Sequence, residues 1–273
     1  MKRLFTALAL LIANASAHAE LMLNPTRVVF AGNQRAAQIE LINNGTAPAS
    51  YRISLVNRRM TETGEFQPVD AAAPGEQFAD GMLSFSPRQV TLQPGTAQVV
   101  RVMVRKSAEL PAGEYRSHLH FEKLADAEGA ASVEASNGEP RQIGVVVKTL
   151  VGASLPLIVR HQTTGASVAL AGLALQAAGP DRPPVLAFRI ERSGDSSVYG
   201  DISVSYQAAG GAEKTLAQAN GVAVYTPNGL RRAALTLQTG PGIDFARGSL
   251  RLRFRERTEA GGALLAEARL DLP

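Results

Sequence analysis

His118 and His120 are the first residues of this chain whose type and spacing could do chemistry. They alternate along one predicted strand, so both imidazoles would lie on the same face and could share a metal ion. No third ligand lies within sequence range, and two polar side chains on the outer face of a strand explain the pair better. We therefore expect no metal site and no cofactor.

Nucleophiles and carboxylates give no catalytic pattern either. Ser154 follows Gly152 and Ala153, but it lacks the closing glycine and the following helix of a nucleophile elbow. Several carboxylates lie beside turn residues, where capping and solvation explain them: Glu62, Glu65, Asp195 and Asp201. The sequence therefore predicts a protein that is not an enzyme.

The run Ile143–Gly152 is suited to binding rather than to catalysis. One parity is apolar except for Thr149, and Val146 and Leu150 make the opposite face apolar too. Such a strand either lies inside a core or offers one face to a partner. Its place as the last strand of a sandwich, after the turn-rich residues 125–140, favours an exposed edge, which is a template for strand pairing. The apolar ladder consists of Ile143, Val145, Val147 and Val151.

The elements that must position these residues are indicated most clearly at a corner. Leu110–Gly113 has the Pro and Gly of a turn, and Tyr115 begins a period-two alternation. A tyrosine just after such a corner is typical of immunoglobulin-like sandwiches, where its hydroxyl binds nearby backbone. Antibody domains have a cysteine two residues later. This chain has Ser117 there and no cysteine at all, which predicts a sandwich without a disulfide.

Short strands separated by turn residues recur along the whole chain and predict an all-β protein of two immunoglobulin-like sandwiches. We expect a first domain at residues 20–155 and a second at 156–273, joined at the apolar segment Leu155–Arg160, with a groove between them. The expected strands of the first domain are 27–30, 37–42, 50–56, 89–92, 98–104, 115–121 and 142–151. Those of the second are 168–175, 185–191, 201–206, 221–225, 231–238, 249–255 and 264–270.

The first 19 residues have the layout of a cleaved secretory signal peptide. Lys2 and Arg3 precede an apolar stretch, and Ala17-His18-Ala19 forms a small-x-small cleavage site before Glu20. That stretch is too short to span a bilayer, so we expect export without membrane insertion. The formal net charge is only +4, which does not indicate a nucleic-acid-binding protein.

Three segments resemble the PapD-like periplasmic chaperones of the chaperone–usher pathway. They are Thr26–Phe30 near the mature start, Ser86–Gly95 with Gln98–Arg101 after it, and Leu110–Leu119. The resemblance covers the first predicted domain well and the second weakly, where Gly194–Asp201 is similar to the archaic-type branch of the family. It implies two immunoglobulin-like domains in an L-shaped arrangement.

The resemblance also implies a binding site. In that family two basic residues in the cleft bind the C-terminal carboxylate of a pilus subunit, and Arg27 matches the first of them within its Thr-Arg-x-x-Phe motif. The usual second anchor, a lysine four residues before the arginine that ends the final strand, falls at Pro156 when counted back from Arg160. The second anchor is then Lys148 or Arg116. The residues lent to the subunit would be Ile143, Val145, Val147 and Val151.

The expected function is therefore that of a periplasmic chaperone. It would stabilise incomplete pilus or fimbrial subunits by donor-strand complementation and deliver them to an outer-membrane usher. The alternatives are a secreted structural or adhesive subunit and a ligand-binding module. A subunit would carry a donor tail ahead of its fold, for which about ten residues after Glu20 leave little room. A ligand-binding module would show clustered aromatics, but the chain has no tryptophan and five tyrosines.

Overall fold

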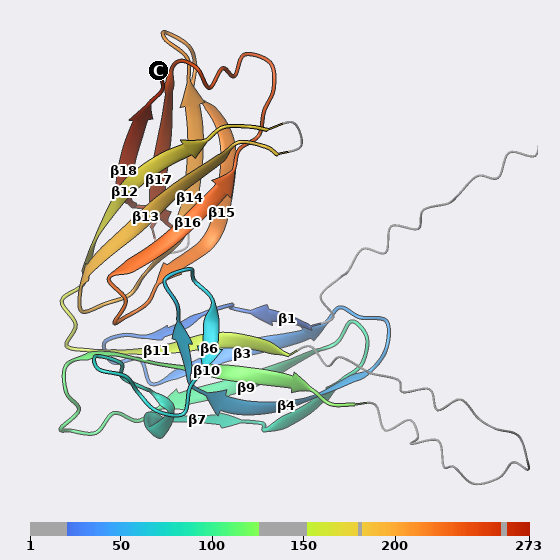
Figure 1. The fold of residues 1–273 in the computed structure, drawn as a ribbon. Helices are drawn as coiled ribbons and strands as arrows, with labels where there is room; N and C mark the ends of the chain where they lie inside the picture. Colours follow the sequence, from blue (N-terminus) through green and yellow to red (C-terminus); the bar gives the residue numbers. More distant parts are fainter. Residues whose placement is uncertain (1–20, 126–151, 180–181, 258–260) are drawn as a thin grey trace, which may run out of the picture.

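The computed structural model describes residues 21–125, 152–179, 182–257 and 261–273. Apart from one short 3-10 turn, η1 (Asp80–Met82), the regular structure of these residues is β-strand. The strands form two sandwiches whose long axes lie at a steep angle, which gives the predicted L shape (Figure 1). The all-β fold class is confirmed. Within the described residues, no helix has the length and apolar character needed to span a membrane.

The first sandwich packs a four-stranded sheet on a five-stranded one. The four-stranded sheet has the order β1 (Leu21–Asn24), β3 (Ala36–Asn43), β9 (Ala97–Val104) and β7 (Leu83–Ser86). The five-stranded sheet has the order β2 (Val28–Phe30), β11 (Ala153–His161), β10 (Gly113–Lys123), β4 (Ala49–Val56) and β8 (Gln89–Leu92). Six of the seven strands expected from the sequence coincide with these, and the seventh, 142–151, lies outside the described residues.

Alternation along β10 fixes the orientation of its side chains. Tyr115, Leu119 and Phe121 are buried in the core of the first sandwich, and the Tyr115 hydroxyl donates a hydrogen bond of 2.9 Å to the Pro111 carbonyl oxygen. This confirms the tyrosine corner. Because successive side chains of a strand point to opposite faces, Glu114 and the other even-numbered residues of β10 face away from this core.

The N-terminal segment changes sheets between β1 and β2. β1 is antiparallel to β3, whereas β2 is parallel to β11, with Val28 opposite Leu157 and Phe30 opposite Val159. β11 also pairs with β10 along its whole length, from Ala153 to His161. The domain boundary expected between residues 155 and 156 therefore falls inside a strand of the first sandwich.

A hairpin of β5 (Arg58–Met60) and β6 (Phe66–Pro68) extends from the first sandwich towards the second (Figure 1). Its turn, which the Thr63-Gly64 pair predicts, needs the positive φ of +90° that Gly64 adopts. At the tip, Glu62 accepts a hydrogen bond of 2.7 Å from the Arg232 backbone amide and forms an ion pair with its side chain. The hairpin is thus a contact between the domains.

The described residues of the second sandwich form seven strands, each of which overlaps one expected from the sequence. The strand expected at 221–225 begins seven residues earlier, at Lys214. The three-stranded sheet of this sandwich has the order β12 (Ala166–Gln176), β13 (Val185–Gly194) and β16 (Leu230–Thr236). Its four-stranded sheet has the order β15 (Lys214–Val224), β14 (Val198–Gln207), β17 (Ser249–Glu256) and β18 (Leu264–Asp271). A separate core of aliphatic and aromatic side chains, among them Leu186, Phe188 and Phe254, fills the space between the sheets.

Candidate functional site

A small third core lies where the two sandwiches meet. Met60 and Ile158 of the first domain pack against Ala223 and Tyr225 of the second, and all four side chains are buried. Val29 and Tyr199 pack on the edge of this cluster. This buried apolar contact lies at the domain junction that the segment Leu155–Arg160 predicts.

Arg27 lies directly before β2 at the rim of this junction. Its Nη2 donates a hydrogen bond of 3.1 Å to the Ser197 Oγ, and its Cζ lies 4.7 Å from the ring centroid of Tyr199 and 5.3 Å from that of Tyr225. Its Nη1 is buried without a hydrogen-bond partner among the described residues. Burial lowers the pKa of Arg27. The site therefore holds a desolvated cation with a free donor.

Arg116, on β10, reaches the same aromatic ring. Its Cζ lies 4.4 Å from the Tyr225 ring centroid, and its two terminal nitrogens donate to the carbonyl oxygens of Thr226 and Arg58, each at 3.3 Å. Its Nε has no partner among the described residues. Burial lowers the pKa of Arg116, and the charge of Arg27 lowers it further. The structure thus brings two of the predicted anchors, Arg27 and Arg116, to one ring, whereas Lys148 lies outside the described residues.

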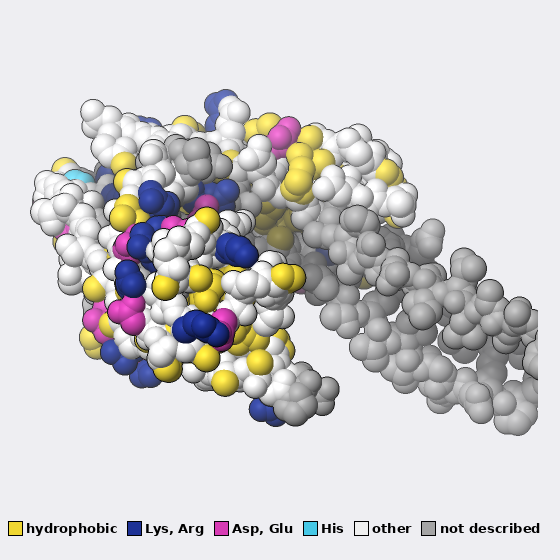
Figure 2. Space-filling model, turned by 90° about the horizontal axis from the view of Figure 1, so that it is seen from above, with side chains coloured by type: hydrophobic (Ala, Val, Ile, Leu, Met, Phe, Trp, Pro, Cys, Tyr) yellow, Lys and Arg dark blue, Asp and Glu magenta, His cyan; other side chains and the backbone are white. Residues whose placement is uncertain are grey.

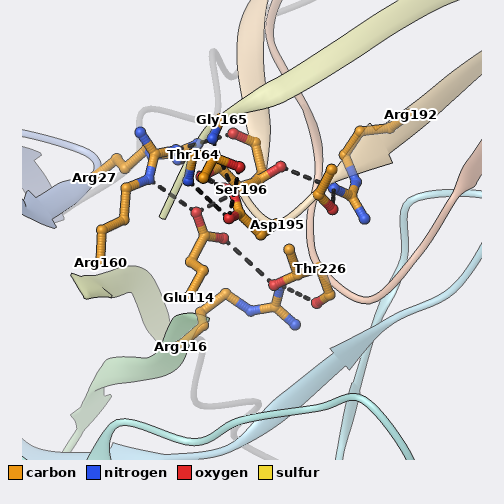
Figure 3. A network of polar contacts seen from close by, with 12 residues as sticks. Arg27, Glu114, Arg116, Arg160, Thr164, Gly165, Arg192, Asp195, Ser196 and Thr226 are labelled. Atoms are coloured by element: carbon orange, nitrogen blue, oxygen red, sulfur yellow. Dashed lines mark hydrogen bonds and ion pairs between the residues drawn. The ribbon is translucent and has the colours of Figure 1, made fainter. Parts of the chain in front are cut away.

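A buried carboxylate that the sequence analysis did not single out, Glu114, balances part of this charge (Figure 3). It accepts hydrogen bonds from the Arg160 Nε at 3.0 Å and from the Ser197 backbone amide at 2.9 Å. A longer one, 3.5 Å, comes from the Thr226 hydroxyl. Arg160 also donates to the Ser197 carbonyl oxygen at 2.9 Å. The parity of β10 was the available signal, because Glu114 and Arg116 share the face that leaves the core.

The loop that presents Ser197 is held by its own polar contacts (Figure 3). Asp195 accepts hydrogen bonds from the backbone amides of Thr164 at 2.7 Å and Gly165 at 2.9 Å. These bonds lower the pKa of Asp195 to about 2, so the carboxylate stays ionised at neutral pH. Arg192 donates to the carbonyl oxygens of Gly194 and Ser196. Asp195 is therefore structural, as its place beside a turn predicts.

A cavity of about 730 Å³ opens beside Arg27 between the two domains. The first domain lines it with Asn24–Arg27, Val29 and Arg160, and the second with residues that include Ser196–Tyr199, Glu256 and Arg257. Elsewhere on the second sandwich, basic and acidic side chains are interspersed, as Figure 2 shows for the end that faces the viewer. In the interdomain cavity, by contrast, Arg27 is desolvated and has a guanidinium N–H group without a hydrogen-bond partner among the described residues.

β11 has a free edge that ends beside Arg27. β2 pairs only with Leu157–Val159, so among the described residues no strand covers that side of Ala153–Pro156. Arg27 precedes Val28, which lies opposite Leu157, and it therefore marks the place where β2 stops covering β11. The predicted donor positions, which precede this edge in the sequence, lie outside the described residues; they are Ile143, Val145, Val147 and Val151.

The histidine pair has a different environment from the one expected. His118 lies on the outer face of β10, opposite Pro156, but it is only 2% exposed. Both of its ring nitrogens lack partners among the described residues, and Phe66 packs edge-on at 5.0 Å. Burial, with the charges of Arg116 and Arg58, lowers its pKa to about 3. A site flanked by arginines repels a cation.

The chain is similar to solved structures of chaperones. The crystal structure of the YadV chaperone shares 12% identity, covers 93% of this chain and 100% of its own, and has a TM-score of 0.46. The Pseudomonas aeruginosa CupB2 chaperone shares 15%, with coverages of 92% and 99% and a TM-score of 0.42. A chain of the Acinetobacter baumannii CsuC–CsuE complex, a chaperone–tip adhesion subunit assembly from archaic chaperone-usher pili, shares 10%, with coverages of 93% and 98% and a TM-score of 0.43. No family model and no curated protein matches the chain.

Proposed function

We propose that this protein is a periplasmic chaperone that binds incomplete β-sandwich pilus subunits by donor-strand complementation and delivers them to an outer-membrane usher. The observation that carries the proposal is the free edge of β11 at Ala153–Pro156, which ends beside the unpartnered Arg27 donor. The signal-peptide pattern of residues 1–19 supports export.

The free edge supports strand addition. An exposed edge offers backbone donors and acceptors to an incoming strand, while alternate side chains give specificity. Leu155, Leu157 and Val159 all face the core of the first sandwich. The residues of the apolar ladder are odd-numbered, like these three. Along one continuous strand, the same set of alternate side chains would therefore fill the client's groove first and the chaperone's own core further on.

The position of Arg27 sets the direction of the bound strand. A client strand that lies along the free edge and places its C-terminal carboxylate at Arg27 must end where β2 begins. Because β11 runs towards that same point, the client strand would be parallel to it. Hydrogen bonds from a guanidinium to a carboxylate contribute about 1.5–3 kcal/mol each, which fixes the register, while the apolar ladder supplies most of the affinity.

The test is co-expression with a pilus subunit from the same organism. Replacing Val145 and Val147 together with serine should leave the chaperone folded but deplete the subunit from the periplasm, because the client groove loses its apolar contacts. Replacing Val146, on the opposite parity, is the matched control and should leave more subunit. If the double variant recovers as much subunit as the parent, donor-strand complementation by this ladder is wrong.

A further inference from the structure

Two tyrosines of the second domain contact the guanidinium groups of the first. Tyr225 follows β15 directly and lies 5.3 Å from Arg27 and 4.4 Å from Arg116, measured from its ring centroid to each Cζ. Tyr199, on β14, lies 4.7 Å from Arg27. Each cation–ring distance is within the range of about 6 Å in which a guanidinium is attracted by an aromatic face. One ring thus contacts both cations.

These contacts offset part of the free-energy cost of burying two positive charges close together. Arg27 and Arg116 are both desolvated, which lowers the pKa of each, and the charge of Arg27 lowers that of Arg116 further. The nearby buried carboxylate, Glu114, is hydrogen-bonded to Arg160, Ser197 and Thr226 rather than to either of them. The aromatic faces, whose quadrupole is negative, supply attraction without occupying the guanidinium N–H groups in the plane.

Tyr225 is well suited to hold a fixed orientation. It is 4% exposed and belongs to the apolar interdomain cluster with Met60 and Ile158. The Phe66 ring, from the β5–β6 hairpin, lies 5.9 Å from it. Burial raises the pKa of Tyr225, so the phenol is neutral at physiological pH and acts as a ring and not as a counter-ion. A rigid ring fixes where the guanidinium groups stack on it.

We infer that Tyr225 and Tyr199 are positioning residues, which hold the Arg27 guanidinium group so that its free N–H donor receives the client's C-terminal carboxylate. The inference rests on the proposed chaperone function and deepens it. The first domain would supply the charges and the second the surfaces that orient them. Recognition of the carboxylate would then require both domains at their present angle, whereas strand addition along β11 would require only the first.

The experiment measures the affinity of the full chain for one pilus subunit in two forms. One form has its native C-terminus, and the other is extended by two glycines, which move the carboxylate away from Arg27. The parent should bind the native form about tenfold more tightly. Tyr225→Phe keeps the aromatic face and should keep this ratio, whereas Tyr225→Leu should reduce it towards one while leaving the affinity for the extended form within about twofold.

Tyr199→Leu, at a less buried ring that contacts Arg27 alone, provides a second variant should Tyr225→Leu not fold. It should reduce the ratio by a smaller factor. If the parent shows the ratio and both leucine variants retain it, the positioning role is overturned while the chaperone function stands. If the parent binds both forms equally, carboxylate capture is absent and the inference fails with it. If the parent binds neither form, the proposed function itself is wrong.

Discussion

Arginines occur in two contrasting settings in this protein. On β17, Arg253 donates to Glu213 at 2.6 Å and to Glu267 at 2.7 Å, and the hydrogen bond that it donates to Glu213 is the main cause that raises its pKa. At the domain junction, Arg27 contacts a hydroxyl and two aromatic rings, and burial lowers its pKa. A guanidinium already bound to two carboxylates has few free N–H donors, and its positive charge is already compensated, so it would attract a further anion only weakly. The comparison shows that the environment, and not the residue type, distinguishes a binding arginine from a structural one.

The largest loss of stability is expected from removing the negative charge of Glu114, the buried carboxylate at the domain junction. Glu114→Gln would leave Arg160, whose side chain is 29% exposed, without its counter-charge and should lower the free energy of unfolding by about 1–3 kcal/mol. Urea denaturation followed by far-UV circular dichroism would measure it. The same change at Glu213, on the partly exposed outer face, should stay below about 1 kcal/mol. Equal losses at the two positions would contradict the comparison.

Arg27→Ala should show the opposite balance, a large loss of binding with a small loss of stability. Removing a charge-assisted donor should weaken client binding by about 10–150-fold. Because the guanidinium is desolvated and has no carboxylate partner, the free energy of unfolding should change by no more than about 2 kcal/mol. Calorimetric titration and thermal melts measure the two quantities. Arg253→Ala is the matched control, and a loss of client binding there would remove the distinction between the settings.

His118 provides a smaller test, through pH. Its folded-state pKa of about 3 lies below the usual 6.5, so the unfolded chain binds the extra proton first. His118 therefore does not weaken the fold above about pH 6.5, and stability falls by up to about 1.4 kcal/mol per unit as the pH drops from there towards 3. His118→Leu should flatten this slope and change stability at neutral pH by only about 1 kcal/mol. A slope identical to that of the parent would show that other groups cause the acid sensitivity.

The sequence predicts most of the fold because alternation and turn residues are local signals. Tyr115 and its corner follow from them, and so does the presence of each described strand of the second domain, although most of β15 was missed. β11 was not predicted, because a proline at its fourth position argues against a strand, and the apolar residues around it are equally typical of a junction. The short strand β1 lies so close to the expected cleavage site that its four residues give little pattern.

The site is predicted only in part, because it depends on how two domains pack. Arg27 could be found from its Thr-Arg-x-x-Phe motif. Arg116 could be found because its expected strand, 115–121, neighbours the expected final strand of the first domain, 142–151. Parity places Glu114 on the same outer face of β10, but its role could not be predicted, because that role depends on Ser197 and Thr226, which are more than eighty residues away in the sequence. The burial of His118 was not evident for a similar reason: the Phe66 ring of the β5–β6 hairpin packs on it, and local alternation does not predict that contact.

Pro156 has a consequence for self-association. Any edge that can accept a client's strand can also accept the same edge of a second copy, which is how soluble β-proteins begin to polymerise. Pro156 has no N–H to contribute to a ladder, and β2 covers the residues that follow it. The described part of the open edge is therefore only four residues long and ends at a residue without a donor. A second copy would find few backbone bonds along these four described residues, so this part of the edge should favour self-association less than a longer, uninterrupted edge would.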